Sequence, residues 1–250
     1  MNEIVGSVRG IFASSGAKGI VVGLSGGIDS AVTASVCVRA VGPEKVTGLL
    51  LFEKAAMEST DSKDAKELVK MLKIETLEFP IDQIFDSFLA NFPLKTKDRV
   101  TIGNLKARIR MTSLYFIANA KNLLVAGTGD RSEDLIGYFT KYGDGGVDFL
   151  PISHLYKTQV RNLAQHLGLP ARIAMKPSSP QLYPGHKATD EIPLDYDRLD
   201  PILKMLLDDQ KPVDEVAHVT KISVEIVREV YGRFRDSVHK RTYPPMVRLW

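Results

Sequence analysis

Between an apolar run and a predicted helix lies a glycine-rich segment, Gly23-Leu24-Ser25-Gly26-Gly27-Ile28-Asp29-Ser30. Adjacent glycines let the backbone approach an anion closely and adopt positive φ angles, and the helix N-terminus directs free N–H groups at that anion. Asp29 would then hold a divalent cation against a phosphate. The alternative is a tight turn in which Asp29 and Ser30 only cap the helix. No lysine follows the glycines, so this is not the nucleoside-triphosphate loop ending in Gly-Lys-Ser/Thr, and the whole string favours a phosphate site.

A second group of polar residues follows the predicted strand at residues 123–126. Thr128 comes directly after this strand, and three carboxylates lie beside the turn, those of Asp130, Glu133 and Asp134. A carboxylate here would join Asp29 in holding Mg²⁺ between phosphates. The alternative is that these acids cap the next helix and pair with its dipole.

Basic residues further along offer charges to an anionic ligand. Arg108 and Arg110 lie two positions apart on a predicted helix and therefore point in different directions. Together with Lys106 they would otherwise form a solvated basic face. Lys141 lies in a glycine-rich loop that suits a polar nucleotide or, alternatively, a surface turn. Lys157 begins a predicted helix, where the common fate of a lysine is a solvated surface position.

Alternating strands and helices must position these groups. Apolar runs rich in β-branched residues predict strands at residues 19–24, 46–51, 74–79 and 123–126, and helices are predicted at residues 30–41, 61–72, 81–92, 101–120 and 157–167. An amphipathic helix precedes the first strand, with an apolar face made of Ile4, Val8, Ile11 and Phe12. This alternation predicts an α/β fold, a doubly wound parallel sheet with helices on both faces. Ligands of such sheets bind beyond the carboxyl ends of the strands.

The C-terminal third departs from this alternation. Residues 176–193 are rich in proline and glycine and predict a long loop, and helices are predicted at residues 199–208, 213–219 and 224–235. No internal repeat or change of composition divides the chain. We therefore expect one domain over residues 1–250, with an α/β core over residues 1–170 and a loop and helical C-terminal extension over residues 171–250.

Composition excludes several classes of protein. The chain of 250 residues has 33 Lys+Arg and 30 Asp+Glu, a balance that does not favour general nucleic-acid binding. Cys37 is the single cysteine, which rules out an intramolecular disulfide and a CxxC metal or redox site. No apolar run reaches the roughly 20 residues of a membrane span, and no signal-peptide pattern opens the chain. The expected compartment is therefore the cytoplasm.

Motifs along the whole chain resemble those of a known family. The SGGIDS string is similar to the pyrophosphate-binding loop of the ATP pyrophosphatases, which form an adenylate and release pyrophosphate. Later blocks resemble those of the NAD synthetases: GNLKARIRM at residues 103–111, Gly127-Thr128 with Glu133, GYFTKYGDGGVD at residues 137–148, then Pro151, Leu155 and Lys157, and His239-Lys240-Arg241 with Pro244. These blocks occur in order over nearly the whole chain, which is more specific than any one of them.

The resemblance implies roles for individual residues. It places Mg²⁺ on Asp29 and Glu133, which together with Lys157 are the expected catalytic residues. It implies ATP contacts for Gly23, Leu24, Ser25, Gly26, Gly27, Ile28, Asp29, Ser30, Thr128, Lys157 and Ser179. It implies contacts with deamido-NAD for Arg110, Lys141, Asp148, His239 and Lys240. Three neighbours are left with structural roles: Arg108, and the helix caps Asp130 and Asp134.

NAD synthetases activate the nicotinate carboxylate of deamido-NAD with ATP and convert the adenylate to an amide. The resemblance thus implies an adenine nucleotide α-hydrolase-like fold, and a homodimeric ligase that uses ATP, Mg²⁺ and ammonia and releases AMP and pyrophosphate. Ammonia is the expected donor because glutamine-using members carry a further domain with a catalytic cysteine, whereas Cys37 lies alone on a predicted helix. Two alternatives stay open: another ATP pyrophosphatase, such as a GMP synthetase subunit or a tRNA-modifying enzyme, and a nucleotide-sensing protein without turnover.

Overall fold

A parallel β-sheet forms the centre of the molecule. In this computed structural model, which describes residues 1–177 and 188–247, its strands are β1 (Gly19–Gly23), β2 (Val46–Leu50), β3 (Glu75–Glu78) and β4 (Leu123–Ala126). They lie in the order β3-β2-β1-β4, and each neighbouring pair is parallel. The predicted parallel sheet is confirmed, and each of these strands lies within one residue of its predicted bounds.

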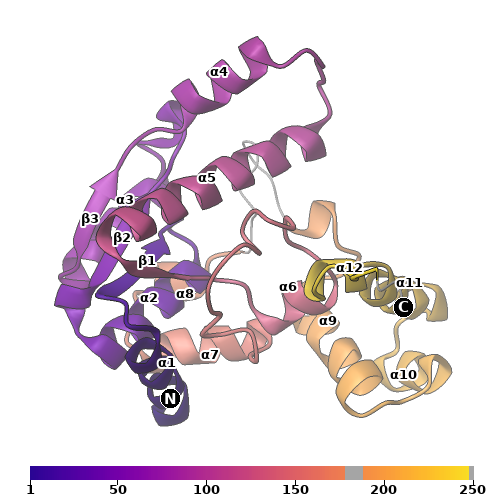
Figure 1. Ribbon diagram of the computed structural model, residues 1–250. Helices are drawn as coiled ribbons and strands as arrows, with labels where there is room; N and C mark the ends of the chain where they lie inside the picture. Colours follow the sequence, from indigo (N-terminus) through magenta and orange to yellow (C-terminus); the bar gives the residue numbers. More distant parts are fainter. Residues whose placement is uncertain (178–187, 248–250) are drawn as a thin grey trace.

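Helices cover both faces of the sheet, because successive side chains of a strand point to opposite sides. One face packs against α1 (Asn2–Ser15), α2 (Ile28–Val41), α3 (Thr60–Leu72), α7 (Lys157–His166) and the short α8 (Ala171–Ala174). The other face packs against α4 (Asp82–Asn91) and α5 (Arg99–Lys121). In β1, Ile20 and Val22 belong to the first core and Val21 to the second. The predicted double winding is confirmed, and Figure 1 shows α4 and α5 on one side of the sheet.

A second hydrophobic core lies beside the sheet, where α6 packs with the C-terminal part of the chain. The helices of this region are α6 (Arg131–Leu135), α9 (Tyr196–Leu203) with a π-helical turn (Lys204–Asp208), α10 (Val213–Thr220) and α11 (Val224–Asp236), and the short α12 (Val238–Arg241) follows α11. In Figure 1 they form a separate group that adjoins α7 through α6 and α9. The three predicted C-terminal helices are confirmed. Of the helices in the described part of the chain, none is long and apolar enough to cross a membrane.

Two details of the helices differ from the sequence prediction. The apolar pattern predicts Ile11 on the buried face of α1, but its side chain is 42 % exposed, whereas Val8 is buried and Ile4 and Phe12 pack beside it. Ile11 lies at the edge of the stripe centred on Val8, and α1 packs chiefly on one neighbour, α2. The helices α8 and α12 are not predicted, because four residues are too few to show a periodic pattern.

Cys37 lies in the middle of α2, and its side chain is completely buried in the core between α2 and the sheet. Burial raises the pKa of its thiol from 9.0 to about 12, because the thiolate would lose its hydration. A nucleophilic cysteine needs a partly exposed site that lowers its pKa. Cys37 is therefore a structural thiol, as its position on a predicted helix suggests.

We expect Cys37 to resist alkylation by iodoacetamide in the native protein and to react only as the chain unfolds. Since its folded pKa is raised, the stability contributed by the neutral thiol is complete below the unfolded value of 9.0 and is lost as the pH rises toward about 12. Mass spectrometry after labelling in increasing urea measures the fraction of Cys37 that is alkylated, and circular dichroism reports unfolding in parallel. Fast labelling without denaturant would contradict the prediction.

Candidate active site

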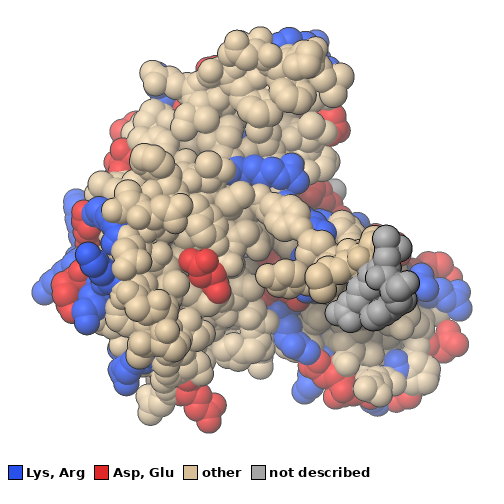
Figure 2. All heavy atoms as spheres, in the orientation of Figure 1, with Lys and Arg blue, Asp and Glu red and all other residues tan. Residues whose placement is uncertain are grey.

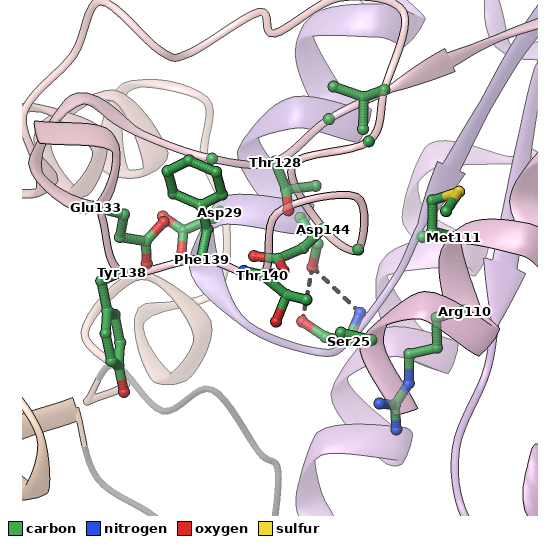
Figure 3. Close-up of a pocket in the computed structure, with 18 of the residues that line it drawn as sticks. Ser25, Asp29, Arg110, Met111, Thr128, Glu133, Tyr138, Phe139, Thr140 and Asp144 are labelled. Carbon is green, nitrogen blue, oxygen red and sulfur yellow. Dashed lines mark hydrogen bonds between the residues drawn. The ribbon is translucent and has the colours of Figure 1, made fainter. Parts of the chain in front are cut away.

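A cavity of about 500 Å³ opens at the carboxyl ends of β1 and β4. Its walls come from the glycine-rich segment after β1, the turn after β4, helix α5, residues 137–147 and the C-terminal helices. Figure 3 shows Ser25 and Asp29 from the first segment, Glu133 from α6 and Arg110 from α5 around the same space. This is the edge of the sheet at which α/β folds bind their ligands.

The glycine-rich segment turns from β1 into α2 through a glycine with positive φ. Gly26 has φ 78°, and a Cβ atom at this position would lie 2.0 Å from the carbonyl oxygen of Asp61 in α3. A side chain here would therefore displace the turn. Ser30 Oγ donates a hydrogen bond to the Gly27 carbonyl (3.0 Å) and accepts one from the Ser25 amide (3.3 Å). These bonds hold the Ser30 hydroxyl beside the cavity, and the Ser25 hydroxyl lies 3.3 Å from it.

The beginning of α2 is open toward a ligand. Gly27 is its N-cap, and among the described residues no side chain caps the first amides. Asp29 points instead toward Lys157, which lies 2.8 Å from its Oδ2 atom. The sequence alternative, a turn in which Asp29 and Ser30 only cap the helix, is therefore wrong. An ion pair takes the Asp29 carboxylate away from the helix amides, and the Ser30 hydroxyl bonds to Gly27 and Ser25 instead.

Asp130 and Glu133 form a capping box at the start of α6. Asp130 Oδ1 accepts a hydrogen bond from the Glu133 amide (2.9 Å), and Glu133 Oε2 accepts one from the Asp130 amide (3.4 Å). The predicted capping role of Asp130 is confirmed. Capping is not its whole role, however, because the Asp130 side chain is 0 % exposed and also contacts Lys157.

Lys157 lies buried at the first residue of α7, with a side chain that is 0 % exposed. Its ammonium lies 2.8 Å from Asp29 Oδ2 and 2.9 Å from both Asp130 Oδ2 and Glu133 Oε1. It also lies 5.2 Å from the centre of the Tyr196 ring. The alternative of a solvated surface lysine is wrong. These contacts tie α2, α6 and α7 together behind the cavity.

Three carboxylates around one ammonium give the cluster an excess of negative charge. Burial, reinforced by Asp29, raises the pKa of Asp130 to about 6 against the opposing effect of Lys157. Burial also raises the pKa of Glu133 well above its ordinary value, again against Lys157. Burial alone would lower the pKa of Lys157, but the three carboxylates outweigh it and raise that pKa well above its usual range. The lysine therefore stays charged, and the carboxylates favour a further cation.

The geometry of the cluster fits a divalent cation on the cavity side. Asp29 Oδ1 is buried and has no hydrogen-bond partner in the described part of the chain. Asp29 and Glu133 line the cavity and lie side by side in Figure 3, whereas Asp130 does not line it. Within residues 1–177 and 188–247, no three His, Cys, Asp or Glu residues are grouped to hold a metal alone. One or two carboxylates completed by phosphate oxygens and water is the donor set that Mg²⁺ prefers.

Arg110 extends from α5 to the cavity wall (Figure 3). Its Nε donates a hydrogen bond of 2.9 Å to the Leu51 carbonyl just beyond β2. Burial lowers the pKa of its guanidinium, while Glu53 acts in the opposite direction. Arg108 donates to the Lys141 carbonyl and does not line the cavity. The two arginines thus point in different directions, as their spacing predicts.

The C-terminal pair predicted to bind deamido-NAD is anchored next to the loop of residues 137–148. Lys240 lines the cavity and donates hydrogen bonds of 2.8 Å to the carbonyls of Gly137 and Phe139. Lys141 donates to the His239 carbonyl. Neither Lys141 nor His239 lines the cavity itself, so of these three only Lys240 is placed there.

The structure does not bring Asp148 to the cavity. Its Oδ1 accepts a hydrogen bond from the Tyr115 hydroxyl (3.0 Å), and its Oδ2 accepts one from the Val125 amide of β4 (2.7 Å). In this conformation the carboxylate fixes the loop to α5 and the sheet. Its contact with deamido-NAD stays a prediction.

Most residues predicted for the ATP site meet in the cavity. Its lining includes Gly23, Leu24, Ser25, Asp29, Ser30 and Thr128, together with the predicted metal ligand Glu133. Four predicted residues lie behind this lining: Gly26, Gly27, Ile28 and Lys157. Ile28 is buried in the core next to α2 and the sheet. Ser179 lies outside the described residues. The individual contacts with ATP stay predictions.

Sequence patterns miss several cavity residues. Asn104 Oδ1 accepts a hydrogen bond of 2.6 Å from Thr140 Oγ1, and both residues line the cavity. Both lie in blocks that resemble the family, which is the signal that could have identified them. Arg233 lines the cavity from α11 and donates to the Glu191 carbonyl (2.6 Å). An arginine on an amphipathic helix carries no comparable signal.

Comparison with known proteins agrees with this geometry. Residues 1–244 match the family described as NAD synthase. The NH(3)-dependent NAD(+) synthetase of Hyperthermus butylicus is 50% identical over 238 residues, which cover 95% of this chain and 86% of that protein. The solved structure of an NMN synthetase from Francisella tularensis has a TM-score of 0.87 and 34% identity, and the match covers 99% of this chain and 97% of that one. An NH3-dependent NAD synthetase from Campylobacter jejuni, in complex with the nitrate ion, has a TM-score of 0.82 and 30% identity, with 99% and 96% covered.

Proposed function

The chain belongs to the NAD synthase family, and from that premise we propose that it converts deamido-NAD (nicotinate adenine dinucleotide) to NAD with ATP and ammonia. One observation carries this proposal: a helix N-terminus that no described side chain caps follows a glycine-rich turn and lies at the same cavity as two carboxylates suited to Mg²⁺. Cations from α5 and α12 line the same cavity. That combination suits two anionic nucleotides held side by side.

The proposed reaction has two bond-forming steps. A nicotinate carboxylate oxygen attacks the α-phosphorus of ATP, and pyrophosphate leaves with the electrons of the broken bond. Ammonia then attacks the activated carbonyl carbon, the bond to AMP breaks, and the nitrogen loses a proton. Cys37 is buried away from the cavity, and neither step needs a covalent nucleophile from the protein. The protein therefore acts by positioning the nucleotides and stabilising charge.

The phosphates of ATP are proposed to lie against the glycine-rich segment, where the open amides of α2 and two hydroxyls meet. Asp29 and Glu133 would hold Mg²⁺ there, and the bound ion would neutralise part of the phosphate charge. Lys157 holds both carboxylates from behind. We propose that ordering these two carboxylates is its main contribution.

The carboxylate substrate is proposed to lie nearer α5 and α12, with Arg110 and Lys240 as its cations on the cavity wall. A homodimer is part of the proposal. Exposed apolar side chains support it, namely Phe88 on α4, Phe92 directly after α4 and Phe116 on α5. The surface over α4 is mostly free of charged residues in Figure 2. A cytoplasmic location stays a prediction.

A second candidate substrate is nicotinate mononucleotide, because the Francisella tularensis structure is that of an NMN synthetase. Both acids present the same carboxylate, and they differ in the adenylate half. Release of pyrophosphate on adding ATP with either acid distinguishes the two substrates. Faster turnover of the mononucleotide would replace deamido-NAD in the proposal. No release with either acid would favour a nucleotide-sensing protein.

We expect NAD formation from an ammonium salt and none from glutamine when the purified chain is given ATP, Mg²⁺ and deamido-NAD. The single cysteine is buried, and burial raises its pKa to about 12, so it cannot form the thioester by which glutamine is hydrolysed. Neutral ammonia is the attacking species because ammonium has no lone pair. At fixed, subsaturating total ammonium, the rate should therefore climb with pH until the enzyme titrates or unfolds.

Chromatographic separation of NAD from deamido-NAD measures this result. Cys37→Ser is the matched control, and it should leave the ammonia reaction in place. Robust NAD formation from glutamine that Cys37→Ser abolishes would overturn the assignment of the donor.

A further inference from the structure

Lys176 connects the segment after α8 to the glycine-rich turn. Its Nζ donates hydrogen bonds of 2.8 Å to the Gly26 carbonyl and to Asp61 Oδ1, and a shorter one to Asp64 Oδ2. Asp61 and Asp64 lie in the first turns of α3. One ammonium therefore joins three segments that are more than 30 residues apart in the sequence.

The orientation of the Gly26 carbonyl determines the orientation of the Gly26–Gly27 peptide in the turn. A peptide between two glycines has little steric resistance to reversal, and reversal would turn a carbonyl oxygen toward an anion. The C=O and N–H of a trans peptide point in opposite directions, so a bond that fixes the Gly26 carbonyl also fixes the Gly27 amide. That amide donates a hydrogen bond to Ser25 Oγ (3.2 Å), and Ser25 lines the cavity.

The contact between Lys176 and the acidic residues of α3 is largely buried. The side chain of Lys176 is 17 % exposed and that of Asp64 is 3 % exposed. Burial alone would raise the pKa of Asp64, but hydrogen bonds from Lys176 and Arg172 outweigh it and lower that pKa. Gly26 packs so closely on α3 that its Cβ position would lie 2.0 Å from the Asp61 carbonyl oxygen. The ammonium thus has a fixed place against the turn.

Arg172 contacts the same acidic residues from the outer side. It pairs with Asp64 (2.8 Å) and with Glu67, and its side chain is 49 % exposed. No hydrogen bond links it to the glycine-rich turn in the described part of the chain. Arg172 and Lys176 therefore share Asp64 as a partner, and only Lys176 reaches Gly26.

We propose that Lys176 is a positioning residue for the phosphates of ATP, which fixes the Gly26–Gly27 peptide so that its N–H holds the Ser25 hydroxyl at the cavity. It acts through the turn and does not line the cavity itself. The inference rests on the proposed function only in naming ATP as the nucleotide. Replacing a residue with this role should weaken the binding of ATP and leave the affinity for deamido-NAD unchanged.

Lys176→Met is expected to raise the KM for ATP about tenfold, because it removes one charge-assisted hydrogen bond that orients a phosphate donor. The KM for deamido-NAD should change less than about twofold. Steady-state kinetics with each substrate varied in turn measures this split, and calorimetric titration with ATP and Mg²⁺ checks it without turnover. Arg172→Met is the matched control, since it removes a cation from Asp64 without touching the turn.

Thermal melting separates a positioning role from a structural one. Both methionine variants should lower the melting temperature, but only Lys176→Met should weaken ATP binding. Lys176→Arg keeps the charge beside Asp61 and Asp64 and should recover most of the lost affinity. If Lys176→Met does not fold, Lys176→Arg and Lys176→Gln decide the question by the same titration, with the glutamine variant the weaker ATP binder.

Two outcomes would overturn the proposal: unchanged ATP affinity in Lys176→Met, or an equal loss in Arg172→Met. Failure of the proposed function is a different result. In that case the wild-type protein forms no NAD, while the titrations of ATP into wild type and variants still test Lys176.

Discussion

Lys157→Met is expected to destabilise the protein by about 3–5 kcal/mol near neutral pH and to abolish NAD formation. The change removes an ammonium that lies 2.8 or 2.9 Å from the carboxylates of Asp29, Asp130 and Glu133. Methionine occupies a similar volume, so the effect reports the lost charge more than a cavity. Activity is lost because the two carboxylates proposed to hold Mg²⁺ no longer have a common partner.

The deficit in stability should shrink as the pH falls. Burial raises the pKa of Asp130 to about 6 and that of Glu133 well above its ordinary value, and without Lys157 both pKa values rise further. A carboxyl group with a raised folded pKa contributes stability that is complete below its unfolded pKa and is lost as the pH rises through the folded one. The variant is therefore closest to wild type at acidic pH and falls behind as the pH increases.

Urea unfolding of both proteins at a series of pH values measures this difference. Lys211→Met is the control, because Lys211 forms an exposed ion pair with Glu215. Loss of that pair should change stability by no more than about 0.5 kcal/mol. A Lys157→Met protein as stable as wild type at neutral pH, or a deficit that does not depend on pH, would contradict the role of the buried charge.

Local sequence patterns are sufficient to predict where the strands of this fold lie in the sequence, but not to predict their order in the sheet. In β1 the residues from Gly19 to Val22 are all buried, and such continuous burial leaves an apolar run that is easy to recognise. The order β3-β2-β1-β4 depends on where each connecting helix crosses the sheet, which no local pattern contains. The edge strand β3 carries Glu75 and Glu78 on its exposed positions, so its apolar signal is weaker.

The site shows the same division between local and long-range information. Asp29 and Glu133 are predicted together because each follows a strand, and Val22 pairs with Ala126 at the ends of those strands. The burial of Lys157 is not predictable in this way, because its partners Asp29 and Glu133 lie 128 and 24 residues away in the sequence. The contact between Lys176 and Gly26 spans 150 residues. Motifs therefore identify groups that face a ligand better than groups that act from behind.

Asp29→Asn and Glu133→Gln are each expected to lower kcat for NAD formation by at least about a hundredfold and to raise the Mg²⁺ concentration that gives half the maximal rate. Each replacement keeps the size of the side chain and removes its charge. Asp29 and Glu133 line the cavity, and Asp29 Oδ1 is buried with no hydrogen-bond partner in the described part of the chain. Rates measured over a range of Mg²⁺ concentrations, with circular dichroism as the check on folding, test this expectation.

Asp130→Asn separates cation binding from the support of Lys157. All three carboxylates contact Lys157, but Asp130 does not line the cavity, and asparagine is as good an N-cap as aspartate. This variant should lose stability without a greater requirement for Mg²⁺. Near-normal turnover of Asp29→Asn or Glu133→Gln at saturating Mg²⁺ would mean that the carboxylate concerned is not a metal ligand. If Asp130→Asn raises the Mg²⁺ concentration for half the maximal rate by the same factor, the Mg²⁺ dependence belongs to the charge of the whole cluster. Access to the cavity is what distinguishes Asp29 and Glu133 from Asp130.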